Sequence, residues 1–121
     1  MKKLVIVLII LLAASAAYAD TINLGDFPVG AWIDSNYDAV WEFTSTNIRI
    51  LSTSGAVLWD FRGKTIQNFS VSLDGAQPVI SFSCPEAGRS YRFAKSLTNS
   101  NLTMQIERSG LAAYSVNMRS R

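Results

Sequence analysis

The side chains of this sequence that could act on another molecule are mostly aromatic rings and arginines. The chain has no histidine, which removes the commonest general base and the commonest metal ligand of proteins. Its single cysteine, Cys84, has no second cysteine or histidine with which to build a zinc site. The sequence therefore predicts no catalytic residue, no metal site and no cofactor, and a protein that is not an enzyme.

Carboxylates are sparse, and they gather near the first predicted strands. The four in this region are Asp26, Asp34, Asp38 and Glu42. They could surround one mouth of a barrel, or they could be ordinary loop charges. Asp34 or Asp38 could act as a general acid, although no partner that would tune either group is evident from the sequence. Lys64, in a predicted turn, and Lys95, at a predicted strand end, are expected to be solvated.

Aromatic side chains are the best candidates for binding another molecule. Their rings supply apolar contact area, and those of Tyr and Trp add a polar group. The predicted ligand-binding residues are Trp32, Tyr37, Trp41, Trp59, Tyr91 and Tyr114. Arg89 and Arg92 flank Tyr91, whereas Arg49, Arg62 and Arg108 are assigned to the polar positions of predicted strands, where they would face solvent.

Residues 1–19 have the pattern of a secretory signal peptide. Lys2 and Lys3 precede an apolar run, and small residues follow it up to the Ala17-Tyr18-Ala19 motif. The apolar run is shorter than the roughly 20 residues that span a bilayer. We therefore expect cleavage after Ala19, which leaves residues 20–121 as one domain in the bacterial periplasm or outside the cell, with no further transmembrane segment.

The charge of the remaining chain restricts its partners. Lys2 and Lys3 account for the net charge of +2, so residues 20–121 are neutral. A neutral surface gives no electrostatic reason to bind nucleic acid or anionic lipid. The expected partners are a small hydrophobic ligand or a protein of the cell envelope.

Apolar residues alternate with polar ones along most of the chain, as in strands with one buried face. Turn signals recur about every ten residues, which predicts nine strands counted from Trp32. Asp74-Gly75 is a strong hairpin signal, and Ile66 is out of phase with the following strand, which predicts a bulge near Asn68. Residues 35–43 are ambiguous, because a helical turn there competes with a strand from about Ala39.

Short connections exclude parallel strands, so we expect one antiparallel meander of eight to nine strands. Closure into a small barrel would cover the apolar face, and a β-sandwich is the alternative. Cys84 is expected to be buried with its neighbours. The predicted inward side chains are Trp41, Phe43, Ile48, Ile50, Val57, Trp59, Phe61, Phe69, Val71, Leu73, Ile80, Phe82, Cys84, Tyr91, Phe93, Leu102, Met104, Ile106, Tyr114, Val116 and Met118. So many large side chains favour a filled interior over a hollow one.

The Gly30-Ala31-Trp32 sequence resembles the start of the first strand in calycins, the superfamily of lipocalins, fatty-acid-binding proteins and avidins. The resemblance would cover residues 25–121. It implies a closed barrel that binds a small apolar molecule in its interior or at its mouth. It also implies an arginine late in the chain that packs over Trp32, with Arg119 as the first candidate and Arg108 as the second.

The segment 80–93 also resembles the periplasmic inhibitors of C-type lysozymes, which are small β-barrels too. This second resemblance implies a solid barrel whose loops bind another protein. Two functions therefore stay open: a lipocalin-like carrier or sensor of a small apolar ligand, and a protein-binding module of the cell envelope.

Overall fold

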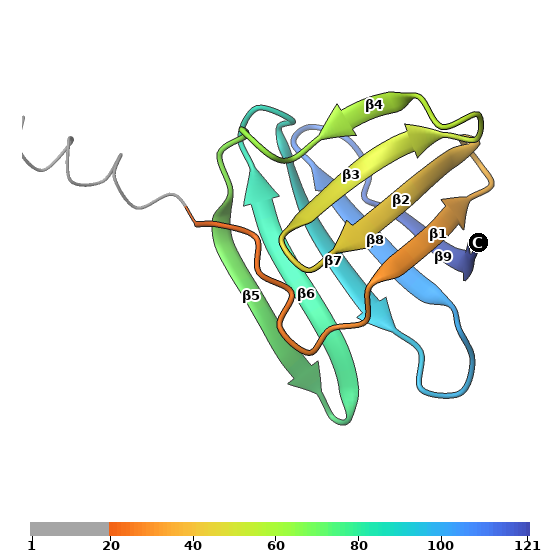
Figure 1. Cartoon of the computed structure of the whole chain (residues 1–121). Helices are drawn as coiled ribbons and strands as arrows, with labels where there is room; N and C mark the ends of the chain where they lie inside the picture. The colour runs from red at the N-terminus through yellow and green to blue at the C-terminus, as the bar shows by residue number, and fades with distance from the viewer. Residues whose placement is uncertain (1–19) are drawn as a thin grey trace, which may run out of the picture.

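A computed structural model describes residues 20–121 of the chain, so the predicted signal peptide and its cleavage site lie outside the described residues. Nine strands form one antiparallel sheet (Figure 1). They are β1 (Gly30–Asp34), β2 (Ala39–Thr44), β3 (Asn47–Ser52), β4 (Val57–Asp60), β5 (Gln67–Asp74), β6 (Gln77–Cys84), β7 (Arg89–Lys95), β8 (Leu102–Arg108) and β9 (Tyr114–Ser120). Their order in the sheet is β4-β3-β2-β1-β9-β8-β7-β6-β5. Within residues 20–121 there is no helix.

Several local predictions from the sequence are confirmed. The nine strands and the antiparallel meander are present, and β2 begins at Ala39 after a turn rather than a helix. The register of β5 against β6 shifts at Asn68, which has a φ of 55° and forms the expected bulge. The hairpin between β5 and β6 turns at Gly75, whose φ of 64° suits a residue without a side chain.

The sheet curls into a half-barrel that is open between β4 and β5. These two strands are consecutive in the chain and form the two edges of the sheet, without pairing to each other. A closed barrel would need that pairing. The short β4 ends at Asp60, and the following residues Phe61 and Ile66 turn their side chains into the core before β5 begins.

Three residues of the predicted inward set are exposed, and all three belong to these edge strands. The exposed fractions are 52% for Val57, 40% for Val71 and 69% for Leu73. Val71 pairs with the buried Ile80, so it lies on the concave face as expected. It is exposed because no opposite strand covers that end of the half-barrel. Alternation gave the correct face of β5, but it could not give the position of the opening.

The interior is filled by large apolar side chains. Trp41, Phe43, Phe82, Phe93 and Met104 are all buried, which agrees with the predicted filled core. Aromatic rings meet edge to face in its centre, for example Phe43 and Phe93 with ring centroids 5.0 Å apart. Cys84 is fully buried and is a free cysteine, as the sequence predicted.

Residues 20–29 form an irregular N-terminal arm that joins the two sides of the opening (Figure 1). The Asp20 amide donates to the carbonyl of Ile66 at 2.7 Å, and the Leu24 amide donates to the carbonyl of Ser45 at 2.9 Å. The side chains of Leu24 and Phe27 are buried in the core. The arm therefore completes the core where the sheet does not close.

The first and last strands meet in the middle of the sheet. Trp32 pairs with Ser120 and Ile33 pairs with Arg119, so Arg119 lies on the face opposite to the Trp32 ring. The arginine contact implied by the calycin resemblance is therefore not made by Arg119. The Trp32 indole instead donates to the carbonyl of Ser100 at 2.8 Å. Within residues 20–121, no helix has the length and the apolar character that crossing a bilayer requires.

Candidate functional site

A cavity of about 300 Å³ lies at the mouth of the half-barrel, between β1–β3 on one side and β7–β9 on the other. We call it the mouth cavity. Its walls are aromatic and aliphatic, with one carboxylate and two arginines among them. The lining residues are Asp34, Tyr37, Ala39, Trp41, Ile50, Arg89, Met104, Ile106, Arg108 and Tyr114. Three of the six aromatic residues predicted from the sequence, Tyr37, Trp41 and Tyr114, are brought together here.

The carboxylate of Asp34 is the most deeply buried charge in the described chain, with 2% of the residue exposed. The Tyr114 hydroxyl lies 3.0 and 2.8 Å from its two oxygens and donates to it, and the Asn36 amide donates at 3.0 Å. The Asn36 side chain in turn donates to the Tyr114 oxygen at 2.9 Å. Burial, and to a lesser degree the neighbouring Asp34, raise the pKa of the Tyr114 phenol. This network ties β1 to β9 and fixes one wall of the cavity.

The aromatic walls have different exposures. Tyr37 is 67% exposed and packs edge to face on Tyr114, with ring centroids 5.4 Å apart. Trp41 forms the floor, where it is buried and contacts Phe93 at 5.4 Å between centroids. A flat apolar molecule entering the cavity above Trp41 would cover the exposed ring surface of Tyr37.

Arginines were considered for recognition from the sequence, but the predicted ligand-binding residues included neither Arg89 nor Arg108. Arg108 was assigned to a polar position, which is wrong. It lies two residues beyond Ile106, and Arg89 lies two residues before Tyr91, so both continue the inward phase of their strands. This two-residue spacing from an inward residue was the signal in the sequence that both arginines face inward. The signal was overlooked because charged residues are usually assigned to solvent.

The other three predicted aromatic residues lie elsewhere. Trp32 is buried against Phe43, with centroids 5.3 Å apart, and Tyr91 is buried in the core. Trp59 is half-buried on edge strand β4, where the Lys64 ammonium lies 4.7 Å from the centre of its ring. None of the three lines the mouth cavity.

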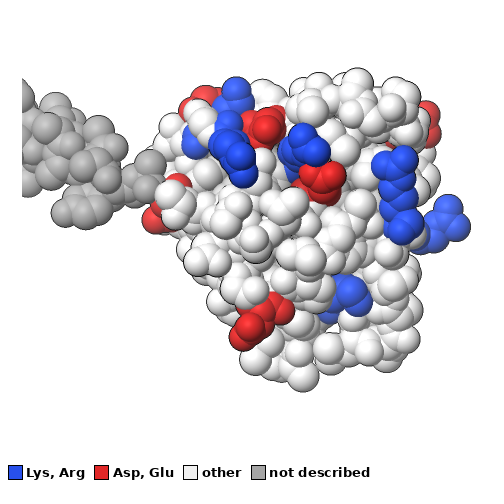
Figure 2. All heavy atoms as spheres, viewed as in Figure 1, with Lys and Arg blue, Asp and Glu red and all other residues white. Residues whose placement is uncertain are grey.

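The carboxylates near the first strands do not form a ring around the mouth. Asp34 alone lines the cavity, while Asp26 and Asp38 are exposed turn residues. Glu42 lies on the outer face of the sheet, in an ion pair with Arg49. On the face that Figure 2 shows, positive and negative side chains lie beside one another near the top, other charges lie apart, and most of the surface is uncharged. This distribution gives no reason to expect a polyanion as partner.

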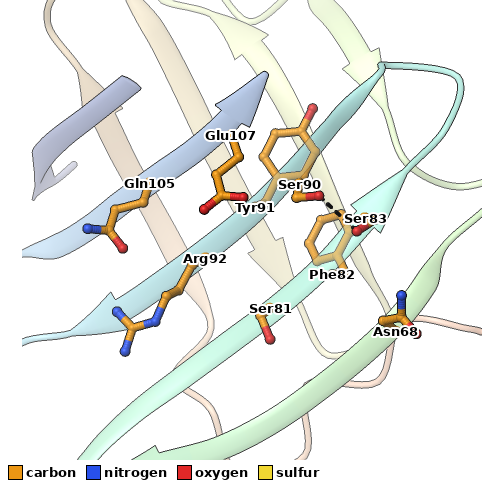
Figure 3. Close-up of a pocket in the computed structure, with 9 residues that line it drawn as sticks. All are labelled: Asn68, Ser81, Phe82, Ser83, Ser90, Tyr91, Arg92, Gln105 and Glu107. Atoms are coloured by element: carbon orange, nitrogen blue, oxygen red, sulfur yellow. Dashed lines mark hydrogen bonds between the residues drawn. The ribbon is translucent and has the colours of Figure 1, made fainter. Parts of the chain in front are cut away.

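A second hollow of about 240 Å³ lies on the outer face of β5–β8 (Figure 3). Polar side chains point into it, but several are already paired. Ser83 and Ser90 are hydrogen-bonded at 2.9 Å, and Arg92 forms an ion pair with Asp74. We regard this hollow as a solvated sheet surface, and the mouth cavity as the candidate site.

The buried Tyr91 gives the fold a measurable pH dependence. Burial raises the pKa of its phenol to about 12, from an ordinary value of 10.0. The folded state favours the neutral phenol, so its contribution to stability is complete below pH 10 and is lost as the pH rises through 12. Urea unfolding should show a steeper loss of stability over this interval for the wild-type protein than for Tyr91→Phe. Parallel curves for the two proteins would contradict the prediction.

In residues 20–121 no group of three or more histidine, cysteine or carboxylate side chains is placed to hold a metal ion. No protein-family model, no curated protein and no solved structure matches this chain. The function must therefore be argued from the mouth cavity itself.

Proposed function

We propose that this chain is a non-enzymatic binding protein that holds a small apolar molecule in the mouth cavity. The proposal includes export across the bacterial inner membrane, which rests on the N-terminal pattern of the sequence. It also includes the calycin-like arrangement, in which a β-barrel core carries a ligand at its mouth.

The observation that supports the proposal is the composition of the cavity. Tyr37, Trp41 and Tyr114 present aromatic surface to one space of about 300 Å³, next to aliphatic groups from β3 and β8. Ligand sites in proteins are concave and mostly apolar, with a few polar groups that fix orientation. The remaining interior is filled with side chains, so a ligand would lie at the mouth rather than deep inside.

Titration calorimetry with naphthylacetamide, a neutral flat molecule, tests the proposal. We expect saturable binding to the wild-type protein and about tenfold weaker binding to Tyr37→Ala, since one aromatic contact contributes about 1 kcal/mol or more. Tyr37 is exposed, so its removal should leave the fold intact. Leu73→Ala is the matched control, because Leu73 is equally exposed and lies outside the cavity. Absence of binding, or equal loss in both variants, would contradict the proposal.

The second candidate function, a protein-binding module of the envelope, is favoured by a different observation. The edge strand β5 exposes Val71 and Leu73 and carries no lysine or proline that would guard an edge. Placing a charge there with Leu73→Lys should abolish a stoichiometric complex with an envelope protein and leave naphthylacetamide binding unchanged. A complex that survives this substitution would count against an edge-mediated interaction.

A further inference from the structure

Two arginines face each other across β7 and β8 at the rim of the mouth cavity. Arg89 is the register partner of Arg108, and both line the cavity. Directly opposed side chains of an antiparallel pair lie on the same face and interact, so like charges at such positions repel. The fold therefore holds two positive groups together at the place where a ligand would enter.

Elsewhere the fold gives a cross-strand arginine a partner of opposite charge. Arg49 lies opposite Glu42 in the register of β2 and β3, and the two form an ion pair. The ion pairs found within residues 20–121 include neither Arg89 nor Arg108. Arg89 and Arg108 therefore differ from Arg49, because each lies opposite a like charge and neither forms an ion pair.

The carboxylate inside the cavity does not serve as the missing partner. The single hydroxyl proton of Tyr114 is shared between the two oxygens of Asp34, and one of these oxygens also accepts from the Asn36 amide. Arg108 is fixed by the backbone instead, because its Nε and Nη2 both donate to the carbonyl of Ala112, at 3.1 and 2.6 Å. A guanidinium that is already held in place loses less entropy when it binds an anion.

The same two arginines also line a neighbouring hollow of about 380 Å³, which lies at the start of β7 and the end of β8. Its one carboxylate is that of Glu107, which pairs in register with Ser90 and so lies on the opposite face from Arg108. The mouth cavity itself therefore carries two positive groups and one negative group, the Asp34 carboxylate, whose oxygens already accept hydrogen bonds.

We propose that Arg89 and Arg108 together bind the anionic group of the ligand, a carboxylate or a phosphate, while its flat apolar part lies against Tyr37 and Trp41. This inference rests on the proposed function, since it assigns the chemical class of the molecule held in the same cavity. Guanidinium groups match the planar geometry of a carboxylate and the oxygens of a phosphate, and such charge-assisted hydrogen bonds are strong. An anion between the two arginines also removes their mutual repulsion.

Calorimetry with naphthylacetate and naphthylacetamide separates this inference from the proposed function, because the two probes share a ring and differ in charge. We expect the acid to bind at least about tenfold more tightly than the amide at low salt, with a preference that declines as salt is added. Arg89→Gln and Arg108→Gln should each weaken binding of the acid far more than binding of the amide, and so remove most of the preference. Arg49→Gln, the control, should keep it. Naphthyl phosphate, used as a third probe, decides between carboxylate and phosphate.

Equal affinities for acid and amide, or a preference that survives both arginine variants, would overturn the inference and leave the proposed function standing. Failure of both probes to bind would overturn the two together. A second measurement addresses the repulsion directly. The thermal midpoint of Arg89→Gln at low salt should be higher than that of the wild-type protein, and a lower midpoint would show that Arg89 supports the fold and would overturn the inference.

Discussion

Replacing Phe61 with alanine is expected to lower the free energy of unfolding by about 3–5 kcal/mol. Phe61 follows the edge strand β4, and its fully buried ring crosses the opening of the half-barrel. It meets the rings of Phe82 and Tyr91 edge to face, each with centroids 5.3 Å apart. Because β4 and β5 are not paired, these ring contacts help to join the two sides of the opening. The loss would be a large part of the ~5–15 kcal/mol typical of a domain.

Leu73→Ala is the control for this measurement. Leu73 was also predicted to face inward, but it is 69% exposed on β5. Its truncation should change the free energy of unfolding by no more than about 0.5 kcal/mol. Urea unfolding of both variants compares the two positions. Similar losses would contradict the open half-barrel, because a closed barrel would bury both side chains.

Removing the hydroxyl group of Tyr114 is expected to cost about 1–3 kcal/mol of stability, and more than its small size suggests. In Tyr114→Phe the Asp34 carboxylate keeps its burial and loses the donor that reaches both of its oxygens. A buried charge that loses a hydrogen bond bears the desolvation cost without compensation. Thermal or urea unfolding measures the change.

Tyr37→Phe is the matched control, since Tyr37 packs on Tyr114 and loses the same atom. Its ring is largely exposed, so the variant should be as stable as the wild-type protein within about 0.5 kcal/mol. The double variant with Asp34→Asn should recover part of the loss in Tyr114→Phe, because a neutral amide costs less to bury than a carboxylate. A Tyr114→Phe protein of unchanged stability would show that water replaces the hydroxyl group.

Much of the fold could be predicted from local patterns. Alternation gave the strands and their buried face, and the out-of-phase Ile66 indicated the bulge at Asn68. The opening between β4 and β5 could not be predicted in this way. It depends on which distant strand covers which end of the sheet, and the alternating pattern of Val71 and Leu73 is the same in a closed and an open barrel.

The candidate site was predicted in part. Aromatic type identified Tyr37, Trp41 and Tyr114, but the same reasoning also selected Trp32, which is a core residue. Residue type does not distinguish a ring that lines a cavity from a ring that fills the core. The sequence did not distinguish Asp34 from the other acidic residues near it. Its burial depends on the pairing of β9 with β1, which brings the hydroxyl group of Tyr114 to its carboxylate.

The pairing of β1 with β9 has a consequence for folding kinetics. Trp32 and Ser120 lie near opposite ends of the described chain, and their contact closes a loop that contains most of the protein. Contacts of such high order are slow to form, because the entropy of closing the loop is lost before the contact stabilises the chain. The hairpins on either side should therefore form early. One wall of the mouth cavity comes from the β1–β3 side and the other from the β7–β9 side. The cavity should therefore be completed only when β1 and β9 pair at the end of folding.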